Sequence, residues 1–130
     1  MTRRNKIIYW IVTAWLALGM LSAGLVQLIR VDAEVDMMNH LGYPVYLLTI
    51  LGVSKLLGIA VILAPRMALL KEWAYAGFVF TLAGAVISHL VLGDAFADIL
   101  PPLLLLALTA ASWHFRPEDR KIGGPQRRDR

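Results

Sequence analysis

One apolar stretch with a single cation near its middle constrains this chain more than any other feature. Residues 43–65 read YPVYLLTILGVSKLLGIAVILAP, and Lys55 is the one charged residue among them. At about 1.5 Å per residue, a helix over 45–64 would cross the ~30 Å hydrocarbon core of a bilayer. A lysine at its centre costs roughly 2.5–3.5 kcal/mol to insert, so it needs a polar partner or a path to water. We therefore expect a membrane helix with a polar site at Lys55.

Three further apolar runs extend this interpretation to the whole chain. Residues 7–29 follow a basic start and are too long for the apolar part of a signal peptide, so we predict a retained first helix. Residues 73–92 form another span. Residues 99–115 are at the short end of the spanning range, with Pro101 and Pro102 in the predicted first turn. A re-entrant or tilted segment would give the same pattern at 99–115.

The sequence thus predicts an all-α membrane protein. Residues 1–116 would form a four-helix transmembrane bundle, and residues 117–130 a charged, mobile cytoplasmic tail. Between the first two spans, residues 30–44 are acidic, and their spacing of apolar residues fits either a short amphipathic surface helix or an acidic loop.

Composition agrees with a membrane protein and excludes several functions. The chain is 58% hydrophobic and only 17% charged, with a mean hydropathy of +0.64, whereas soluble domains are about 25% charged. The absence of cysteine excludes disulfide, thiolate-zinc and thiol-relay chemistry by the chain's own residues. The basic residues lack the aromatic interleaving typical of nucleic-acid binding, so no nucleic-acid partner is expected.

The distribution of positive charge predicts an orientation. Of the 13 lysines and arginines, all but Arg30 and Lys55 lie in the N-terminus, the turn at 65–72 or the C-terminal tail. By the positive-inside rule both termini are cytoplasmic, which requires an even number of crossings. The loops at 30–44 and 93–98, which are rich in Asp and Glu, then face outward.

Given this orientation, several polar residues share the outer half of the bundle. Lys55, His89, Gln27 and Tyr43 are the candidates for binding a ligand or exchanging a proton, since imidazole gains and loses protons near neutral pH. The structural alternatives are that Lys55 joins helices by bonding to a neighbour and that His89 is a satisfied interfacial residue. The histidines have no metal-ligand spacing, and no catalytic set or metal site is predicted.

Glycines indicate where helices approach one another. Gly52 and Gly58 flank Lys55 on one helix face, and Gly77 and Gly84 lie on a face of small residues in the 73–92 run. Such faces allow close helix packing in membranes, so these four glycines are predicted packing positions.

The sequence also resembles a known family. The runs HLGYPVYLLTILGVSKLLGIAVILAP and LKEWAYAGFVFTLAGAVISH are similar to the DoxX-like family of small bacterial four-helix membrane proteins. The resemblance implies a multi-pass protein of the bacterial cytoplasmic (inner) membrane, and a link of the broader group to quinone-coupled redox complexes. It marks as positions of interest Gly42, Tyr43, Pro44, Lys55, Tyr75, Gly77 and His89.

Three functional hypotheses follow. The first is an accessory or ligand-binding membrane subunit whose pocket takes a small amphipathic molecule such as a quinone. The second is a small oligomeric transporter or proton-linked permeation unit, although no inverted repeat is evident. The third is a structural scaffold without a site of its own. A redox role would need a bound cofactor or another subunit, and the partners expected are the lipid bilayer, further copies of the chain or another membrane subunit.

Overall fold

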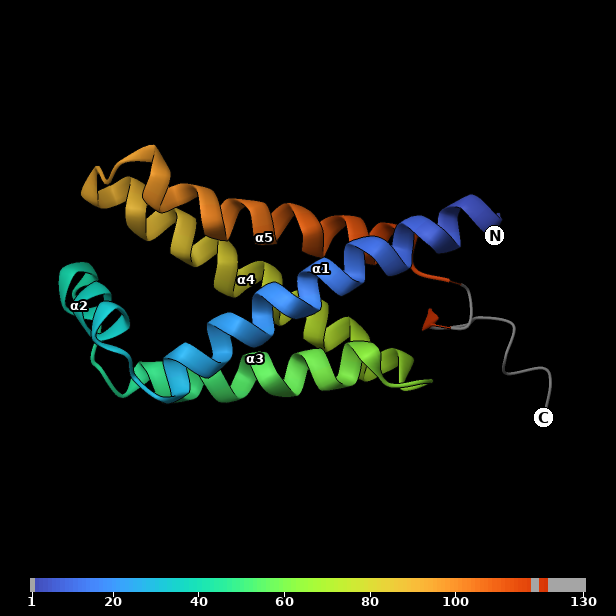
Figure 1. The fold of residues 1–130 in the computed structure, drawn as a ribbon, viewed down its shortest axis with the longest axis horizontal. Coiled ribbons are helices and arrows are strands. Elements are labelled where there is room, and N and C mark those ends of the chain that lie inside the picture. Colours follow the sequence, from blue (N-terminus) through green and yellow to red (C-terminus); the bar gives the residue numbers. More distant parts are fainter. Residues whose placement is uncertain (1, 118–119, 122–130) are drawn as a thin grey trace.

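The computed structural model describes residues 2–117 and 120–121, and the regular elements in this part of the chain are five α-helices. Their bounds are α1 Arg3–Leu28, α2 Asp32–Leu41, α3 Leu47–Leu63, α4 Ala68–Leu92 and α5 Phe96–Phe115. The four long helices form a bundle, and the short α2 lies across one end of it (Figure 1). We call this end, which also holds the turn at 93–95, the α2 end, and the opposite end, where α1 begins and α5 ends, the termini end.

The core joins three of the long helices. Helix α1 packs against both α3 and α5, and α4 packs against α3 and α5. The buried residues of the central apolar cluster are Leu16 and Met20 of α1, Ile59 and Ile62 of α3, and Tyr75, Phe78 and Leu82 of α4, and leucines of α5 pack against them. Hydroxyls also pair inside the bundle, because the Ser112 hydroxyl lies 2.7 Å from that of Thr13 and 2.8 Å from that of Tyr75. These pairs satisfy polar groups that would be costly to bury alone.

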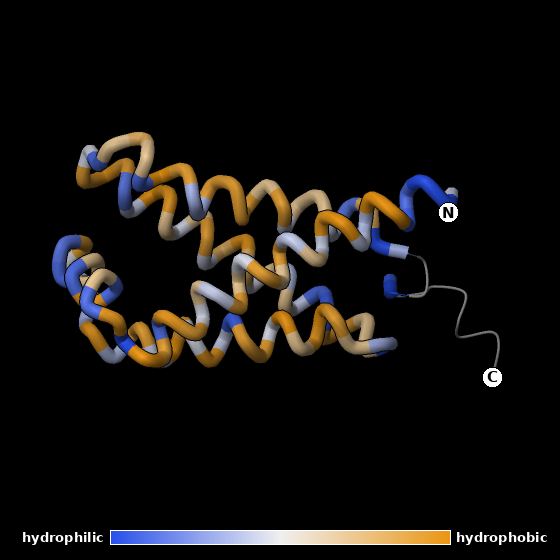
Figure 2. The backbone as a smooth tube through the Cα atoms, viewed as in Figure 1, coloured by the Kyte–Doolittle hydropathy of each residue, from blue (hydrophilic) through white to orange (hydrophobic). Residues whose placement is uncertain are grey.

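The outside of the bundle is strongly apolar. Large side chains point outward along its length, among them Phe80 at 77% exposure and Val91 at 78%. Soluble proteins rarely expose apolar surface on this scale. Hydrophilic residues gather at the two ends and in α2, and mostly apolar residues lie between them (Figure 2). Helices α1, α4 and α5 are long and apolar enough to cross a membrane, in agreement with three of the predicted spans.

The helix that carries Lys55 is shorter than predicted. Helix α3 has 17 residues, because residues 44–46 form a turn before it and Ala64, in extended conformation before Pro65, ends it. Seventeen residues are at the lower limit for a span. The fourth crossing therefore stays a prediction.

Two other helices begin earlier than predicted. Helix α4 starts at Ala68 instead of 73, so Lys71 and Glu72 are helical rather than part of a turn. Helix α5 starts at Phe96 instead of 99, and Asp98 lies in its first turn, where the helix dipole favours an acid. The prediction that Pro101 and Pro102 lie in the first turn was therefore wrong, because both prolines lie deeper inside the helix.

Of the two alternatives for residues 30–44, the structure has the helix. Helix α2 begins with two acids in its first turn, Asp32 and Glu34, which suit the positive end of the helix dipole. It ends at Gly42, whose φ of +82° is the left-handed conformation that glycine adopts without strain.

At the termini end, two cations bind the last carbonyl groups of α3. The ammonium of Lys71, only 1% exposed, donates to the backbone oxygens of Val61 (2.7 Å), Arg66 (2.6 Å) and Ala64. The Arg120 guanidinium donates to the oxygens of Ile62 (2.8 Å) and Ala64 (3.0 Å). Carbonyls at a helix end lack intrahelical donors, so these cations supply them.

The same contacts bear on the predicted tail. The sequence predicts a mobile tail at residues 117–130. Most of these residues lie outside the described part of the chain, so mobility there stays a prediction. Arg120, however, is buried at 8% exposure and stacks over the ring of Trp10 at 4.8 Å. The start of α1 and residue 120 therefore lie at the same end of the bundle (Figure 1).

The four predicted packing glycines fall into two pairs. A Cβ on Gly52 would lie 2.8 Å from the Gly24 oxygen of α1, and one on Gly58 would lie 2.6 Å from the Phe78 ring of α4. Both glycines thus permit close helix contacts. At Gly77 and Gly84, no described atom lies within 4 Å of the Cβ position. These two do not pack closely against another helix of the same chain, and their missing side chains leave open space instead.

Candidate functional site

A cavity of about 500 Å³ lies at the α2 end, and all five helices contribute to its wall. This volume falls within the range of small-molecule sites, about 300–1,000 Å³. The four residues singled out from the sequence all line it, namely Gln27, Tyr43, Lys55 and His89. The structure shows that these four residues share one cavity. Their role in binding a ligand stays a prediction.

Lys55 is buried in the bundle and has a neutral partner. Its ammonium donates to the Gln27 side-chain oxygen at 2.8 Å, and both side chains are 7% exposed. Lys55 comes from α3 and Gln27 from α1, and the two helices cross closely at Gly24 and Gly52. An ammonium has three donors and this bond uses one of them, while Lys55 itself lines the cavity.

The two remaining candidates, His89 and Tyr43, are each fixed by a contact that involves a residue just after a helix end. Helix α4 ends at Gly93 with a left-handed φ of +70°, where the Asp94 amide bonds to the His89 oxygen at 3.0 Å and the Gly93 amide to that of Leu90. This pattern is a Schellman motif. It folds Asp94 back over the last turn of α4, where one carboxylate oxygen lies 2.7 Å from His89 Nδ1.

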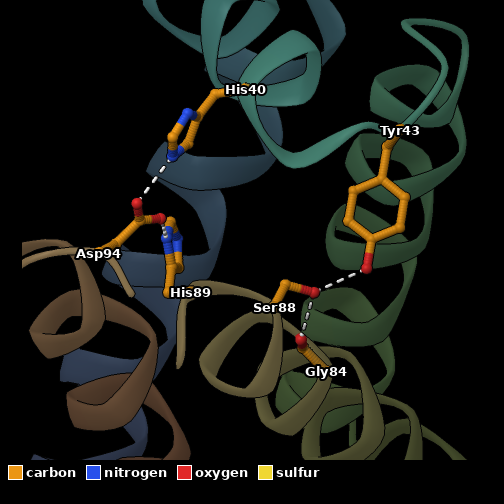
Figure 3. Close-up of polar contacts among 6 residues, drawn as sticks. All are labelled: His40, Tyr43, Gly84, Ser88, His89 and Asp94. Carbon is orange, nitrogen blue, oxygen red and sulfur yellow. Dashed lines mark hydrogen bonds and ion pairs between the residues drawn. The ribbon is translucent and has the colours of Figure 1, made fainter. Parts of the chain in front are cut away.

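Asp94 also reaches the short helix. Its other oxygen lies 2.7 Å from His40 Nε2 of α2, so one carboxylate bridges two imidazoles from different helices (Figure 3). The side chain of His89 is 6% exposed, that of Asp94 11% and that of His40 54%. The cluster therefore runs from the buried wall of the cavity to the surface.

Tyr43 occupies the equivalent position after α2. Gly42 ends that helix with a second Schellman motif, in which the Tyr43 amide bonds to the Met38 oxygen at 2.9 Å. The Ser88 hydroxyl donates to the Gly84 oxygen at 2.8 Å, so the Tyr43 hydroxyl, 2.6 Å away, donates to Ser88 (Figure 3). Tyr43 and His40 together tie α2 and the segment after it to α4.

With this geometry described, similarity to known proteins places the chain in a family. The model of the DoxX-like family matches residues 11–112, which extend from α1 into α5 and include the four candidate residues. The chain belongs to the DoxX-like family. It is also 34% identical over 79 residues to the "Uncharacterized protein YdgD" of Bacillus subtilis (strain 168), a match that covers 58% of this chain and 67% of YdgD. No solved structure matches the chain.

Membership confirms the resemblance inferred from the LGYP, GVSKLLG and SH segments. Together with the apolar helices, it makes this DoxX-like chain a small membrane protein whose long helices lie in a lipid bilayer.

In this DoxX-like protein the Asp94 carboxylate determines which nitrogen of His89 carries a proton. The hydrogen bond from His89, and to a lesser extent the one from His40, holds the pKa of Asp94 below its ordinary value. An ionised carboxylate only accepts hydrogen bonds, so His89 carries a proton on Nδ1. When His89 is neutral, its Nε2 is then a hydrogen-bond acceptor.

Acidic residues at the cavity balance the lysine. Glu34 of α2 and Asp98 of α5 line it together with Lys55. In the described part of the chain, no group of three histidines or acids is arranged to hold a metal ion. The cavity thus offers one buried cation, one imidazole and hydroxyl groups beside two acids.

Sequence reasoning missed Asp94, His40 and Glu34 as members of the site. The polar cluster was expected to open toward Asp94, Asp98 and the acidic first loop, but Asp94 was not named as a binding residue and His40 was assigned to a surface segment. A usable signal was present, because a Gly after a helix, as in His-Leu-Val-Leu-Gly-Asp, predicts a turn that returns the next residue to the helix end.

Proposed function

We propose that this protein is an accessory, ligand-binding membrane subunit whose cavity takes the headgroup of a small amphipathic molecule, with a quinone as the working example. The observation that carries the proposal is the buried pair of Lys55 and Gln27 in the wall of a cavity of ligand size. Buried lysines in membrane helices are costly and are commonly functional, and a neutral amide partner leaves the ammonium available to a carbonyl oxygen.

The chemistry follows from the side chains. Lys55 donates a hydrogen bond to a carbonyl oxygen of the ligand, and the cation stabilises negative charge that develops there. His89, oriented by Asp94, accepts a proton on Nε2 or returns one. The chain's own residues supply no electron carrier, so electrons would come from another subunit. This arrangement suits an accessory subunit better than an independent enzyme.

We further propose that the bundle crosses the bacterial inner membrane four times with both termini in the cytoplasm. The apolar length of α3, the placement of the start of α1 and the end of α5 at one end of the bundle and the positions of the lysines and arginines support this topology. The cavity would then lie in the outer half of the membrane.

The test is quinone binding by the purified full-length protein in lipid nanodiscs. Lys55→Met removes a charge-assisted hydrogen bond worth about 1.5–3 kcal/mol, so the dissociation constant should rise roughly 10- to 100-fold. Lys6→Met is the matched control, because Lys6 is exposed at the start of α1 and should leave binding unchanged.

His89→Gln provides a second arm of the test. It should weaken quinone binding less than Lys55→Met does, but it should abolish the uptake or release of protons by the protein when the quinone binds. Equal affinity of wild type and Lys55→Met would refute the proposed role of Lys55. A wild-type protein that binds no quinone at all would refute the quinone as ligand.

A further inference from the structure

A second space lies beside the cavity, between α3 and α4. This α3–α4 groove has a volume of about 550 Å³, and its wall includes Leu57, Gly58 and Val61 of α3 and Trp73, Gly77 and Phe78 of α4. Gly77 widens the groove because it has no side chain, and no described atom lies within 4 Å of the position that a Cβ would take. Leu57 and Trp73 are each 63% exposed, so the groove lies at the outer surface of the bundle.

The groove adjoins the cavity. Leu51, Lys55 and Thr81 line both spaces, so Lys55 lies in the wall that the two share. Among the described residues of the groove wall, Lys55 is the one with a charge, and the rest of the wall is mainly aliphatic and aromatic. The charged groups of the two adjoining spaces therefore lie toward the α2 end, and the wall along α3 and α4 is mainly apolar.

Electrostatics distinguishes the two routes to Lys55. From the α2 end, a ligand meets Glu34 and Asp98 in the cavity wall, so an anion meets repulsion there. Along the groove it meets apolar side chains that face lipid. The site thus favours a neutral molecule that already resides in the bilayer.

We infer that the α3–α4 groove holds the linear apolar chain of the same ligand whose headgroup occupies the cavity. The ligand class is a neutral, lipid-soluble molecule with a hydrogen-bond-accepting headgroup and an extended chain, and it enters sideways between α3 and α4. This inference rests on the proposed function, since the headgroup in the cavity is what fixes the chain in the groove.

The experiment locates the chain directly. The full-length protein in nanodiscs is irradiated with a benzoquinone whose alkyl chain carries a photoreactive diazirine, and the labelled residues are mapped by mass spectrometry. A phosphatidylcholine with the same diazirine chain is the comparison probe. The quinone probe should label groove residues such as Leu57 and Trp73 in preference to the lipid-facing Ile87, which is 58% exposed.

Two variants make the result specific. Gly77→Phe places a large side chain at a position where a Cβ meets no described atom within 4 Å, and it should lower groove labelling by the quinone probe about tenfold, while Ile87→Phe should leave it unchanged. Lys55→Met should lower it as well, because the headgroup is no longer held. Labelling of the groove by the phosphatidylcholine probe should respond to neither Lys55→Met nor Ile87→Phe.

The outcomes separate this inference from the proposed function. Quinone binding that depends on Lys55, with labels spread evenly over the lipid-facing helices and unaffected by Gly77→Phe, would overturn the groove and leave the cavity site intact. Equal groove labelling by both probes, unchanged in Lys55→Met, would assign the groove to bulk lipid and also overturn the inference. No quinone binding by the wild type would overturn both.

Discussion

Asp94 accepts hydrogen bonds from two histidines on different helices and so joins α2 to α4 through a single carboxylate. Both bonds need the ionised form, and they lower its pKa in the folded protein. A carboxyl group with a lowered folded pKa contributes stability above its ordinary pKa, and this contribution is lost as the pH falls through the lowered value.

At the residue scale we therefore predict that Asp94→Asn lowers the melting temperature in detergent at pH 6. The difference from wild type should begin to narrow as the pH falls below about 4, the ordinary pKa of an aspartate, and should close as the pH falls through the lowered pKa of the folded carboxylate. Asp36→Asn, on the exposed side of α2, is the control and should change little. A difference that persists undiminished at pH 3 would show that the ionised carboxylate is not its source.

The two buried lysines show what can be predicted for single residues. Lys55 stood out in the sequence because it interrupts an apolar run. Lys71 is more deeply buried but looked like part of a basic turn, since it follows Arg66 near a membrane boundary. Its partners are backbone oxygens, which every residue carries, so no residue pattern marks them. Asp94 was missed for a related reason, because its role depends on the turn at Gly93.

At the element scale, the glycines decide which helices cross closely. We predict that Gly52→Ala lowers the free energy of unfolding by about 1–3 kcal/mol, since its methyl group would press on the α1 backbone at Gly24. Gly77→Ala makes the same chemical change in open space. It should leave stability unchanged or raise it by up to about 1 kcal/mol through helix propensity.

The measurement is unfolding of the two variants in mixed detergent, followed by circular dichroism. Equal losses for Gly52→Ala and Gly77→Ala would mean that the close approach of α1 and α3 is not what Gly52 provides.

The helices themselves were predictable from hydropathy, and their ends were less so. The predicted spans at 7–29 and 73–92 overlap α1 and α4 almost fully, because long apolar runs leave little choice of structure. The first turns of α4 and α5 were missed because charged residues at 71, 72 and 98 looked like loop residues, although Asp98 suits the first turn of a helix. Which glycine faces another helix depends on helix rotation, which spacing alone does not determine.

At the scale of the whole molecule, the proposed four crossings can be tested with single cysteines. The natural chain has no cysteine, so each variant carries one reactive thiol without further changes. With a membrane-impermeant maleimide added to intact cells, Ala33→Cys in α2 and Ala95→Cys before α5 should be labelled. Thr2→Cys and Arg66→Cys should be labelled only after the cells are opened.

Labelling of residues 33 and 66 from the same side would contradict the crossing by α3. Labelling of residue 2 from outside would contradict the cytoplasmic N-terminus.

The cations that bind the end of α3 have a consequence for biosynthesis. Lys71 follows Ala64 closely in the chain, but Arg120 comes 56 residues after Ala64 and is made only once α4 and α5 have been translated. The carbonyl groups at this helix end therefore acquire their donors in two stages, one local and immediate, the other only after α4 and α5 have been made. Completion of the α3 end can thus report that the whole bundle has been inserted and closed.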